Sequence, residues 1–216
     1  MPSPQKLIDD RPEESVFRVH RSVFTDPDIF DLEMREIFDS CWLYIGHESQ
    51  LPEHGDYIAT RLGTHPVFAI RGSDGEIRCF YDACSHRGSK LTNRTSGNAK
   101  TIACRYHGWC FNSNGACTLV RGGDDAYQAA DLERMGTSLT PIEQFMGYKG
   151  FLFGCLNTKT PPLEEFLGGA LPFIDLMADQ APNGMEILKG ESRYIMEANW
   201  KLQTENSTDG YHVATV

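Results

Sequence analysis

Two short groups of cysteine and histidine hold the residues of this sequence that are best suited to bind a metal. The first is Cys84-Ser85-His86-Arg87-Gly88, and the second is Cys104-Arg105-Tyr106-His107-Gly108-Trp109, with seventeen residues from 87 to 103 between the two pairs. Thiolate and imidazole are both good metal ligands. The glycine behind each pair lets its loop wrap closely around a bound group. The pattern therefore predicts one site made of Cys84, His86, Cys104 and His107.

Two kinds of metal site use two cysteines and two histidines. One is a mononuclear zinc site, although zinc modules rarely use the Cys-x-His spacing of the first pair. The other is a [2Fe–2S] cluster, whose reduction potential rises when imidazole replaces two of the thiolates. The glycines and Trp109 in the loops favour the cluster over zinc.

At these residues the sequence resembles the Rieske proteins. The resemblance implies a [2Fe–2S] cluster with Cys84 and Cys104 on one iron and His86 and His107 on the other. Respiratory Rieske proteins have a further cysteine in each loop, whereas Ser89 and Tyr106 stand here. The sequence is thus more similar to the oxygenase and ferredoxin types.

Short strands separated by turns are expected around the two loops. Residues 42–47, 56–62, 66–71 and 76–82 are rich in β-forming residues and have turn residues between them. Asn112-Ser113-Asn114-Gly115 predicts another hairpin turn, and residues 150–155 predict a buried strand. We therefore expect residues 42–157 to be a small all-β domain, which the Rieske resemblance implies is an antiparallel β-sandwich.

Helices are expected on both sides of this domain. Asp26 or Thr25 is suited to cap a helix that begins at Pro27, and residues 162–167 and 203–216 are also expected to be helical. In the last of these helices Asp209 and His212 lie three residues apart, on one face. An Asp-x-x-His pair is weak evidence by itself, since a structural carboxylate beside a chance histidine explains it too.

The segment around Asp209 resembles the start of the catalytic domain in α subunits of aromatic-ring-hydroxylating dioxygenases. This resemblance implies that His212 is a ligand of a mononuclear non-haem Fe(II), held by two histidines and one carboxylate. It also implies that Asp209 takes part in electron transfer between subunits, by linking His212 to a cluster histidine of a neighbour. An Asp209 that only caps or solvates the helix is the alternative.

The resemblance extends over nearly the whole chain. Residues 47–52, 147–154, 162–168 and 209–213 are most similar to the benzoate, halobenzoate and anthranilate dioxygenase branch. This resemblance implies that the chain is the α subunit of a bacterial terminal oxygenase. In such an enzyme the cluster passes NADH-derived electrons to Fe(II), and the reaction is cis-dihydroxylation of an aromatic carboxylate with O2. The implied partners are other α subunits and β subunits, in α3β3 or α3 assemblies, and an NADH-dependent reductase with or without a ferredoxin.

Two other functions use similar parts. A Rieske monooxygenase or demethylase has the same two iron sites, and a Rieske ferredoxin has the cluster alone. Residues 161–216 argue against the ferredoxin, because an electron carrier needs no helix with an Asp-x-x-His pattern.

The expected organisation has three parts. An N-terminal arm and helix occupies residues 1–41, the Rieske domain residues 42–157, and the beginning of an α+β catalytic domain residues 158–216. In the family the second iron histidine follows the first by five residues, which corresponds to position 217, and the carboxylate ligand lies further on. We therefore expect the sequence to be the N-terminal fragment of a longer α subunit.

Composition excludes some other classes of function. The net charge of −10 and the pI near 5.1 argue against nucleic acid as a main partner. No run of 18 apolar residues and no N-terminal secretion signal is found in the sequence, so we expect a cytoplasmic protein. The remaining cysteines are expected to be buried free thiols, and the remaining histidines structural or surface residues: Cys41, Cys79, Cys110, Cys117, Cys155, His20, His47, His54 and His65.

Overall fold

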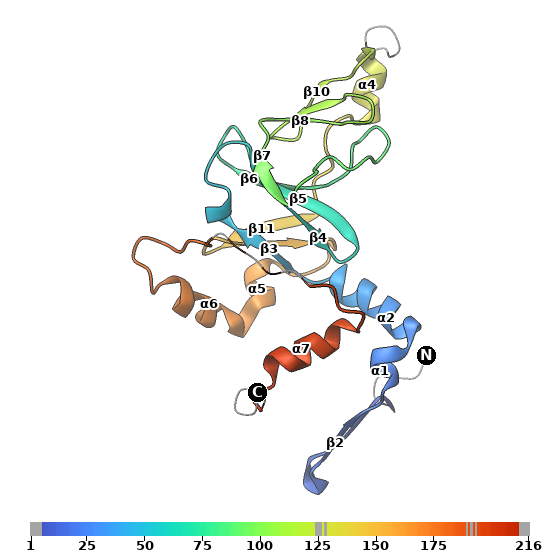
Figure 1. Cartoon of the computed structure of the whole chain (residues 1–216), viewed down its shortest axis with the longest axis vertical. Helices are drawn as coiled ribbons and strands as arrows, with labels where there is room; N and C mark the ends of the chain where they lie inside the picture. Colours follow the sequence, from blue (N-terminus) through green and yellow to red (C-terminus); the bar gives the residue numbers. More distant parts are fainter. Residues whose placement is uncertain are drawn as a thin grey trace. The chain divides into compact units, whose positions relative to one another are not determined.

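The computed structural model describes residues 6–123, 127, 129–188, 190, 192 and 194–211 (Figure 1). The chain forms two compact units. The larger unit consists of residues 37–188, and the smaller one combines residues 1–36 with residues 189–216. None of the helices in the described ranges is long and apolar enough to cross a membrane.

The described residues of the larger unit form three antiparallel sheets. Their strand orders are β6-β5-β4-β7, β10-β9-β8 and β11-β12-β3. The strands are β3 (Leu43–His47), β4 (Asp56–Leu62), β5 (His65–Arg71), β6 (Ile77–Tyr81), β7 (Ser96–Asn98), β8 (Thr101–Ala103), β9 (Cys110–Asn112), β10 (Cys117–Leu119), β11 (Gln144–Tyr148) and β12 (Phe151–Cys155). The strands expected at 42–47, 56–62, 66–71, 76–82 and 150–155 are therefore confirmed, as is the turn between β9 and β10.

The four-stranded sheet is buried on both faces, which explains the continuous apolar run in β5. Successive side chains of a strand point to opposite faces. Phe68 and Ile70 accordingly pack into one core cluster, with Phe80, while Val67 and Ala69 pack into another. The first cluster also contains Cys84 and Cys104. The metal-binding loops are therefore anchored in a hydrophobic core.

Figure 1 shows β8 and β10 on one side of the four-stranded sheet and β3 and β11 on the other. Helix α4 (Ala129–Met135) accompanies the β8–β10 sheet. After β12 come α5 (Leu163–Leu167), the 3-10 turn η5 (Gly168–Ala170) and α6 (Leu171–Ala178). A 3-10 turn, η4 (Glu48–Gln50), follows β3. Helical elements thus follow the β-rich domain, as predicted.

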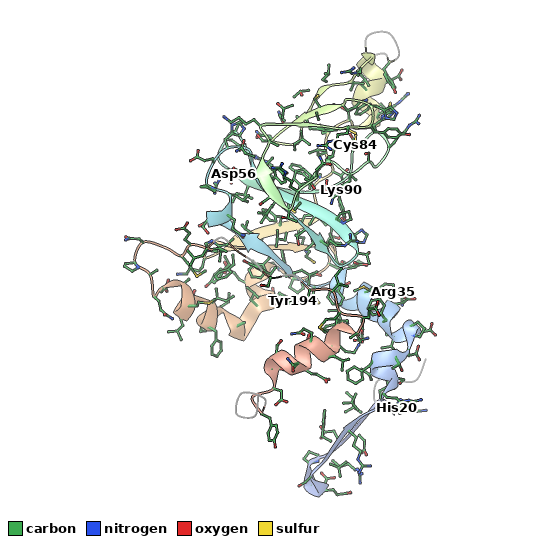
Figure 2. The ribbon with its side chains drawn as sticks, viewed as in Figure 1. His20, Arg35, Asp56, Cys84, Lys90 and Tyr194 are labelled. Atoms are coloured by element: carbon green, nitrogen blue, oxygen red, sulfur yellow. The ribbon has the colours of Figure 1, made fainter. Side chains whose placement is uncertain are left out.

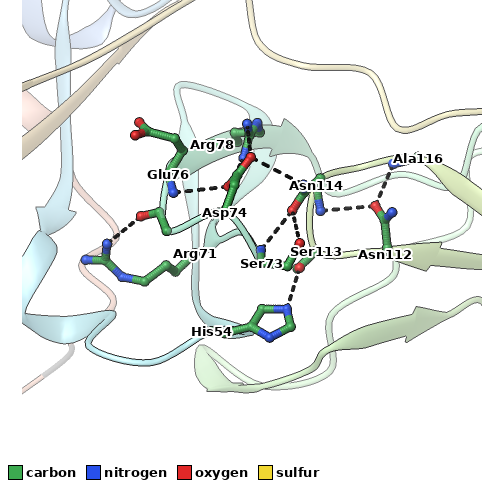
Figure 3. Close-up of polar contacts among 11 residues, drawn as sticks. His54, Arg71, Ser73, Asp74, Glu76, Arg78, Asn112, Ser113, Asn114 and Ala116 are labelled. Carbon is green, nitrogen blue, oxygen red and sulfur yellow. Dashed lines mark hydrogen bonds and ion pairs between the residues drawn. The ribbon is translucent and has the colours of Figure 1, made fainter.

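Hydrogen bonds between two turns connect the four-stranded sheet to the β10-β9-β8 sheet (Figure 3). The Asn114 amide accepts a bond from the Ser73 N–H (2.9 Å) and donates one to Asp74 (3.3 Å). Asp74 in turn holds both terminal nitrogens of Arg78, at 2.9 and 2.7 Å. The turn after β5 is therefore fixed against the turn after β9, the strand that begins directly behind the second metal-binding loop.

In the smaller unit, the described residues form one hairpin and three α-helices. The hairpin pairs β1 (Ile8–Arg11) with β2 (Val16–Val19), and the 3-10 turn η2 (Pro12–Glu14) connects them. The helices are α1 (Ser22–Thr25), α2 (Pro27–Glu33) and α7 (Trp200–Thr208). A π-helical turn, η3 (Met34–Phe38), follows α2.

The caps of these helices follow the sequence. The Asp26 carboxylate accepts a bond from the Asp28 N–H at 2.9 Å, with Pro27 in the first helical position, as predicted. Asn199 caps α7 in the same way. The Glu33 carboxylate connects α2 to α7, because it accepts bonds from the Trp200 ring N–H (2.9 Å) and from Lys201 (2.6 Å).

The prediction of a helix over 203–216 is wrong at residues 209–211. Helix α7 ends there, and Asp209 has extended backbone angles of −82° and 101°. Gly210 and Tyr211 form a turn, and the Asp209 carboxylate before it accepts a bond from the Tyr211 N–H at 2.8 Å. Short polar side chains such as Asp favour turns over helix interiors, and Gly after them ends helices. Residues 212–216 lie outside the described residues.

Candidate metal centre

The two cysteine–histidine loops have the same backbone conformation. In the first, the Cys84 N–H donates to the Ser89 carbonyl (2.9 Å), and the Gly88 N–H donates to the Cys84 carbonyl (2.8 Å). In the second, Cys104 pairs in the same way with Trp109 (2.8 Å) and Gly108 (2.9 Å). Gly88 and Gly108 have φ angles of 68° and 71°, in the left-handed region that glycine adopts without strain. Two matching loops thus face one site.

The two thiols of the site lie together in the core. Cys84 and Cys104 are each only 3% exposed, and their side chains interact directly. Burial raises the pKa of Cys84, although the N–H groups of His86 and Arg87 bond its sulfur. Burial has the same effect at Cys104, but N–H groups of Tyr106 and His107 outweigh it and lower its pKa. Each sulfur therefore receives amide hydrogen bonds from its own loop, which stabilise a thiolate.

The two imidazoles lie together as a second pair. The ring centroids of His86 and His107 are 4.6 Å apart, and His86 stacks on Trp109 at 4.8 Å with an interplanar angle of 4°. The Nδ1 atoms of both histidines are buried and have no hydrogen-bond partner. Burial, then the neighbouring His107 and Arg87, lowers the pKa of His86, which favours the neutral, metal-binding form.

These observations fit a bound group of two metal ions. A buried polar atom without a partner is costly, so two such nitrogens side by side indicate that a ligand satisfies them. Among the described residues, no three His, Cys, Asp or Glu side chains converge as ligands of a single ion would. The four side chains instead form a thiol pair and an imidazole pair, which matches a [2Fe–2S] cluster with a different pair on each iron.

Asp82 is a residue of the site that the sequence analysis did not single out. Its carboxylate is buried, at 2% exposed, and accepts bonds from the N–H groups of Leu91 and Thr92, both at 2.9 Å, and from the Thr92 hydroxyl. These bonds close the base of the loop that carries Cys84 and His86. A sequence cannot show that residues nine and ten positions further on return to this carboxylate.

The other cysteines and histidines lie outside the centre. All five cysteines are free thiols: Cys79 and Cys155 are buried as expected, whereas Cys41, Cys110 and Cys117 are only partly buried. Each histidine contacts a neighbouring side chain: His20 bonds Ser22, His47 bonds Ser49, His54 bonds Ser113, and His65 lies 3.7 Å from Asp39. These contacts fit the expectation of structural or surface histidines, and only at His47 among them is a ring nitrogen, Nε2, also buried without a hydrogen-bond partner.

Asp209 is far from the two loops in the sequence and lies in the smaller unit. Asp209 is exposed and follows the last turn of α7. His212 lies outside the described residues. The roles assigned to Asp209 and His212 therefore stay predictions.

Comparison with known proteins identifies the domain around the centre. A family model described as the Rieske [2Fe-2S] domain matches residues 41–128. The chain is 45% identical over 211 residues to the toluate 1,2-dioxygenase subunit alpha of Pseudomonas putida, which covers 97% of this chain and 46% of that protein. It is 41% identical over 214 residues to the anthranilate 1,2-dioxygenase large subunit of Acinetobacter baylyi, with 98% and 45% covered.

A solved structure gives the same result. The naphthalene 1,2-dioxygenase from Rhodococcus sp. bound to indole superposes with a TM-score of 0.86 at 33% identity, over 91% of this chain and 45% of that chain. The chain spans about half the length of the curated relatives it matches. The residues matched by the Rieske [2Fe-2S] model include all four candidate ligands, which favours a [2Fe–2S] cluster over a zinc ion.

Proposed function

We propose that this chain, which carries a Rieske [2Fe–2S] domain and is homologous to the large subunits of ring-hydroxylating dioxygenases, is the electron-accepting part of such an oxygenase. The proposed reaction is cis-dihydroxylation of an aromatic carboxylate with O2 and NADH-derived electrons. The similarity to proteins named for toluate and anthranilate supports an aromatic carboxylate as the substrate.

The arrangement of the two loops is the observation that carries the proposal. We propose Cys84, His86, Cys104 and His107 as the cluster ligands, because a buried thiol pair lies with two imidazoles whose Nδ1 atoms have no partner. When bound, a [2Fe–2S] cluster supplies one-electron transfer. The two loops of this chain would hold the cluster, their backbone amides would bond the thiolates, and Trp109 stacks on the ring of His86.

The remaining parts of the proposal concern the whole oxygenase. We propose that His212 is one ligand of a mononuclear Fe(II) and that Asp209 connects this iron site to the cluster histidines of a neighbouring subunit. The proposed partners are further α subunits, β subunits and an NADH-dependent reductase, with or without a ferredoxin, in the cytoplasm. These assignments rest on the similarity to large and alpha subunits of dioxygenases.

Metal analysis of the purified protein tests the cluster. We expect a brown protein with two irons and two acid-labile sulfides for each chain, and a reduced form with the low average g-value of mixed cysteine and histidine ligation. Replacing His107 with Cys should lower the reduction potential, because a thiolate stabilises ferric iron more than imidazole does. Stoichiometric zinc without visible absorption would refute the proposal.

Oxygen uptake tests the catalytic part. With its reductase, NADH and an aromatic carboxylate, the full-length oxygenase should consume O2 and release a cis-diol. A full-length protein that accepts electrons but consumes no O2 with any aromatic substrate would instead be a ferredoxin, and a demethylated or singly hydroxylated product would indicate a monooxygenase.

A further inference from the structure

The dipeptide Asn-Gly occurs twice in the sequence, at Asn114-Gly115 and at Asn183-Gly184. Asparagine is a thermolabile residue, because the backbone nitrogen of the next residue can attack its side-chain amide. Glycine hinders this nitrogen least, since it has no Cβ. Both dipeptides belong to the larger unit. Their surroundings in the fold therefore decide how readily each of them reacts.

The two dipeptides have the same backbone arrangement. Each occupies the third and fourth positions of a β-turn. The Gly115 N–H donates to the Asn112 carbonyl at 3.0 Å. The Gly184 N–H donates to the Ala181 carbonyl, also at 3.0 Å. The φ angles of the two glycines are 90° and 86°. The turn itself therefore gives neither asparagine an advantage.

The side chain of Asn114 is held in place by three hydrogen bonds (Figure 3). Its Oδ1 accepts bonds from the Ser73 N–H (2.9 Å) and the Ser73 hydroxyl (3.3 Å), and its Nδ2 donates to Asp74 (3.3 Å). Gly115 behind it is buried, and a Cβ added there would lie 2.5 Å from the Phe80 ring. These bonds must break before the amide of Asn114 can turn toward the Gly115 nitrogen.

The side chain of Asn183 has no such partners. Asn183 and Gly184 are both exposed, and the Asn183 amide makes no hydrogen bond with any residue that the structure describes. Apart from the chain neighbours, no described residue lies within 4 Å of the position that a Cβ on Gly184 would take. In Figure 2 the chain behind α6 forms a loop at the left edge of the larger unit. A small local opening of this turn is therefore enough for the reaction.

We propose that Asn183 is a site of spontaneous deamidation in the folded protein, whereas Asn114 is protected. The Gly184 nitrogen loses its proton to solvent and forms a bond to the side-chain carbon Cγ of Asn183. The bond from Cγ to Nδ2 breaks, and Nδ2 takes up a proton and leaves as ammonia, so that a cyclic succinimide remains. Water then opens the ring to aspartate or isoaspartate. Water is the only co-reactant, and no group is oxidised or reduced.

The product differs from the original chain in charge and, where isoaspartate forms, in the length of the main chain. The net charge of −10 becomes one unit more negative. Isoaspartate adds one methylene to the main chain in the segment between α6 and Leu188, the last residue of the larger unit. Asn183 also lines a surface depression together with Arg71 and Lys149, so the new carboxylate arises on a surface that carries two cations.

Peptide mapping by mass spectrometry measures the two sites separately in the folded holoprotein, incubated at mildly alkaline pH. We expect Asn183 to lose its amide at least about tenfold faster than Asn114, because only at Asn114 must three side-chain hydrogen bonds break first. The same chain unfolded in guanidinium chloride is the reference. There the two asparagines should react at similar rates, since the hydrogen bonds to Ser73 and Asp74 are gone.

Anion exchange of the folded protein follows the acidic product directly. Asn183→Gln should abolish this product, because the ring that the longer side chain would form closes far more slowly. Asn93→Gln is the matched control, since Asn93 is also exposed but is followed by Arg94 instead of glycine. This control variant should form the acidic product at the wild-type rate.

Each outcome decides the question. Equal rates at Asn114 and Asn183 in the folded protein would overturn the proposal, as would an Asn183 that reacts only after unfolding. If Asn183 reacts faster by the same factor in the unfolded chain, the neighbouring sequence and not the fold sets the difference, and the proposal is wrong. An acidic product that persists in Asn183→Gln would place the modification at another residue and would also overturn it.

Discussion

Asp82 lies two residues before Cys84 and stabilises the first metal-binding loop in a way that differs from the second. The second loop lies between β8 and β9, which pair along Thr101–Asn112, Ile102–Phe111 and Ala103–Cys110. The first loop leaves β6 without such a paired strand behind it. In the first loop the Asp82 carboxylate replaces these hydrogen bonds between strands, since it accepts bonds from the N–H groups of Leu91 and Thr92. One buried side chain therefore closes this loop.

Replacing Asp82 with Ala should free the loop. Two buried N–H groups would lose their acceptor, at a cost of about 3 kcal/mol in the free energy of unfolding. We expect faster release of iron in urea concentrations below the unfolding transition, measured by loss of visible absorption. Asp82→Asn keeps an oxygen that can accept bonds from both N–H groups. The free energy of unfolding of this variant should therefore fall by less, about 1 kcal/mol. Iron release from the Ala variant at the wild-type rate would contradict this role.

Residues that act through local spacing could be predicted, whereas residues that act across the fold could not. The ligand candidates Cys84, His86, Cys104 and His107 share two short motifs, so their types and spacing were enough to propose them. Asp82 carries no such motif. Its role depends on which distant residues approach it, and hydrogen bonds over nine residues become visible only in three dimensions.

At the scale of elements, the glycines of the turns set how closely the sheets pack. Gly115, in the turn between β9 and β10, has a φ of 90°, and a Cβ added there would lie 2.5 Å from the Phe80 ring. Gly75, in the turn between β5 and β6, has nearly the same φ of 86° but has nothing within 4 Å of that position. Substitutions at Gly75 and Gly115 therefore share the same backbone strain, and only the one at Gly115 adds a steric contact.

We expect Gly115→Ala to be more destabilising than Gly75→Ala. An alanine in the left-handed region costs about 1 kcal/mol at either site. At Gly115 the contact with Phe80 in the core should add about 1–3 kcal/mol. Urea unfolding followed by tryptophan fluorescence measures both. If the two variants lose the same stability, Phe80 adjusts without cost and the packing argument is wrong.

Strands and caps were predicted well because their signals are local. The turn residues between 53 and 75 set the limits of β4, β5 and β6, and Asp26 with Pro27 set the start of α2. The end of α7 is not predicted, because Asp209 and His212 share a face only if the helix continues, whereas Asp209-Gly210 is itself a turn signal. Thr204, Ser207 and Thr208 also bond backbone carbonyls of α7 through their hydroxyls, which favours helix ends over interiors.

At the scale of the whole molecule, the residues proposed for the cluster and the proposed electron-transfer residue Asp209 come from different units of the chain. The four candidate cluster ligands belong to residues 37–188, while Asp209 belongs to the unit that combines residues 1–36 and 189–216. Glu33 holds α7 within that second unit through Trp200 and Lys201. The N-terminal segment therefore positions the helix that leads to Asp209, which gives the first 36 residues a part in the proposed electron path.

Asp209 provides the test of that path in the full-length oxygenase. Its carboxylate accepts the Tyr211 N–H at 2.8 Å, so a purely local role is to hold the turn after α7. Asn can make the same bond without the charge, whereas Ala cannot. If Asp209 links His212 to a neighbour's cluster histidine, its charge matters, because a carboxylate orients an imidazole ligand and supports its proton.

We therefore expect Asp209→Asn and Asp209→Ala both to keep normal cluster and iron contents and to be reduced normally. In both variants, reoxidation of the prereduced cluster by O2 with substrate present should slow by orders of magnitude. If the role is only local, Asp209→Ala should lose about 1 kcal/mol of stability and Asp209→Asn almost none, with turnover preserved in both. Single-turnover kinetics on the Asn variant decides between the two, because that variant keeps the turn, and a rate near that of the wild type would exclude the link between subunits.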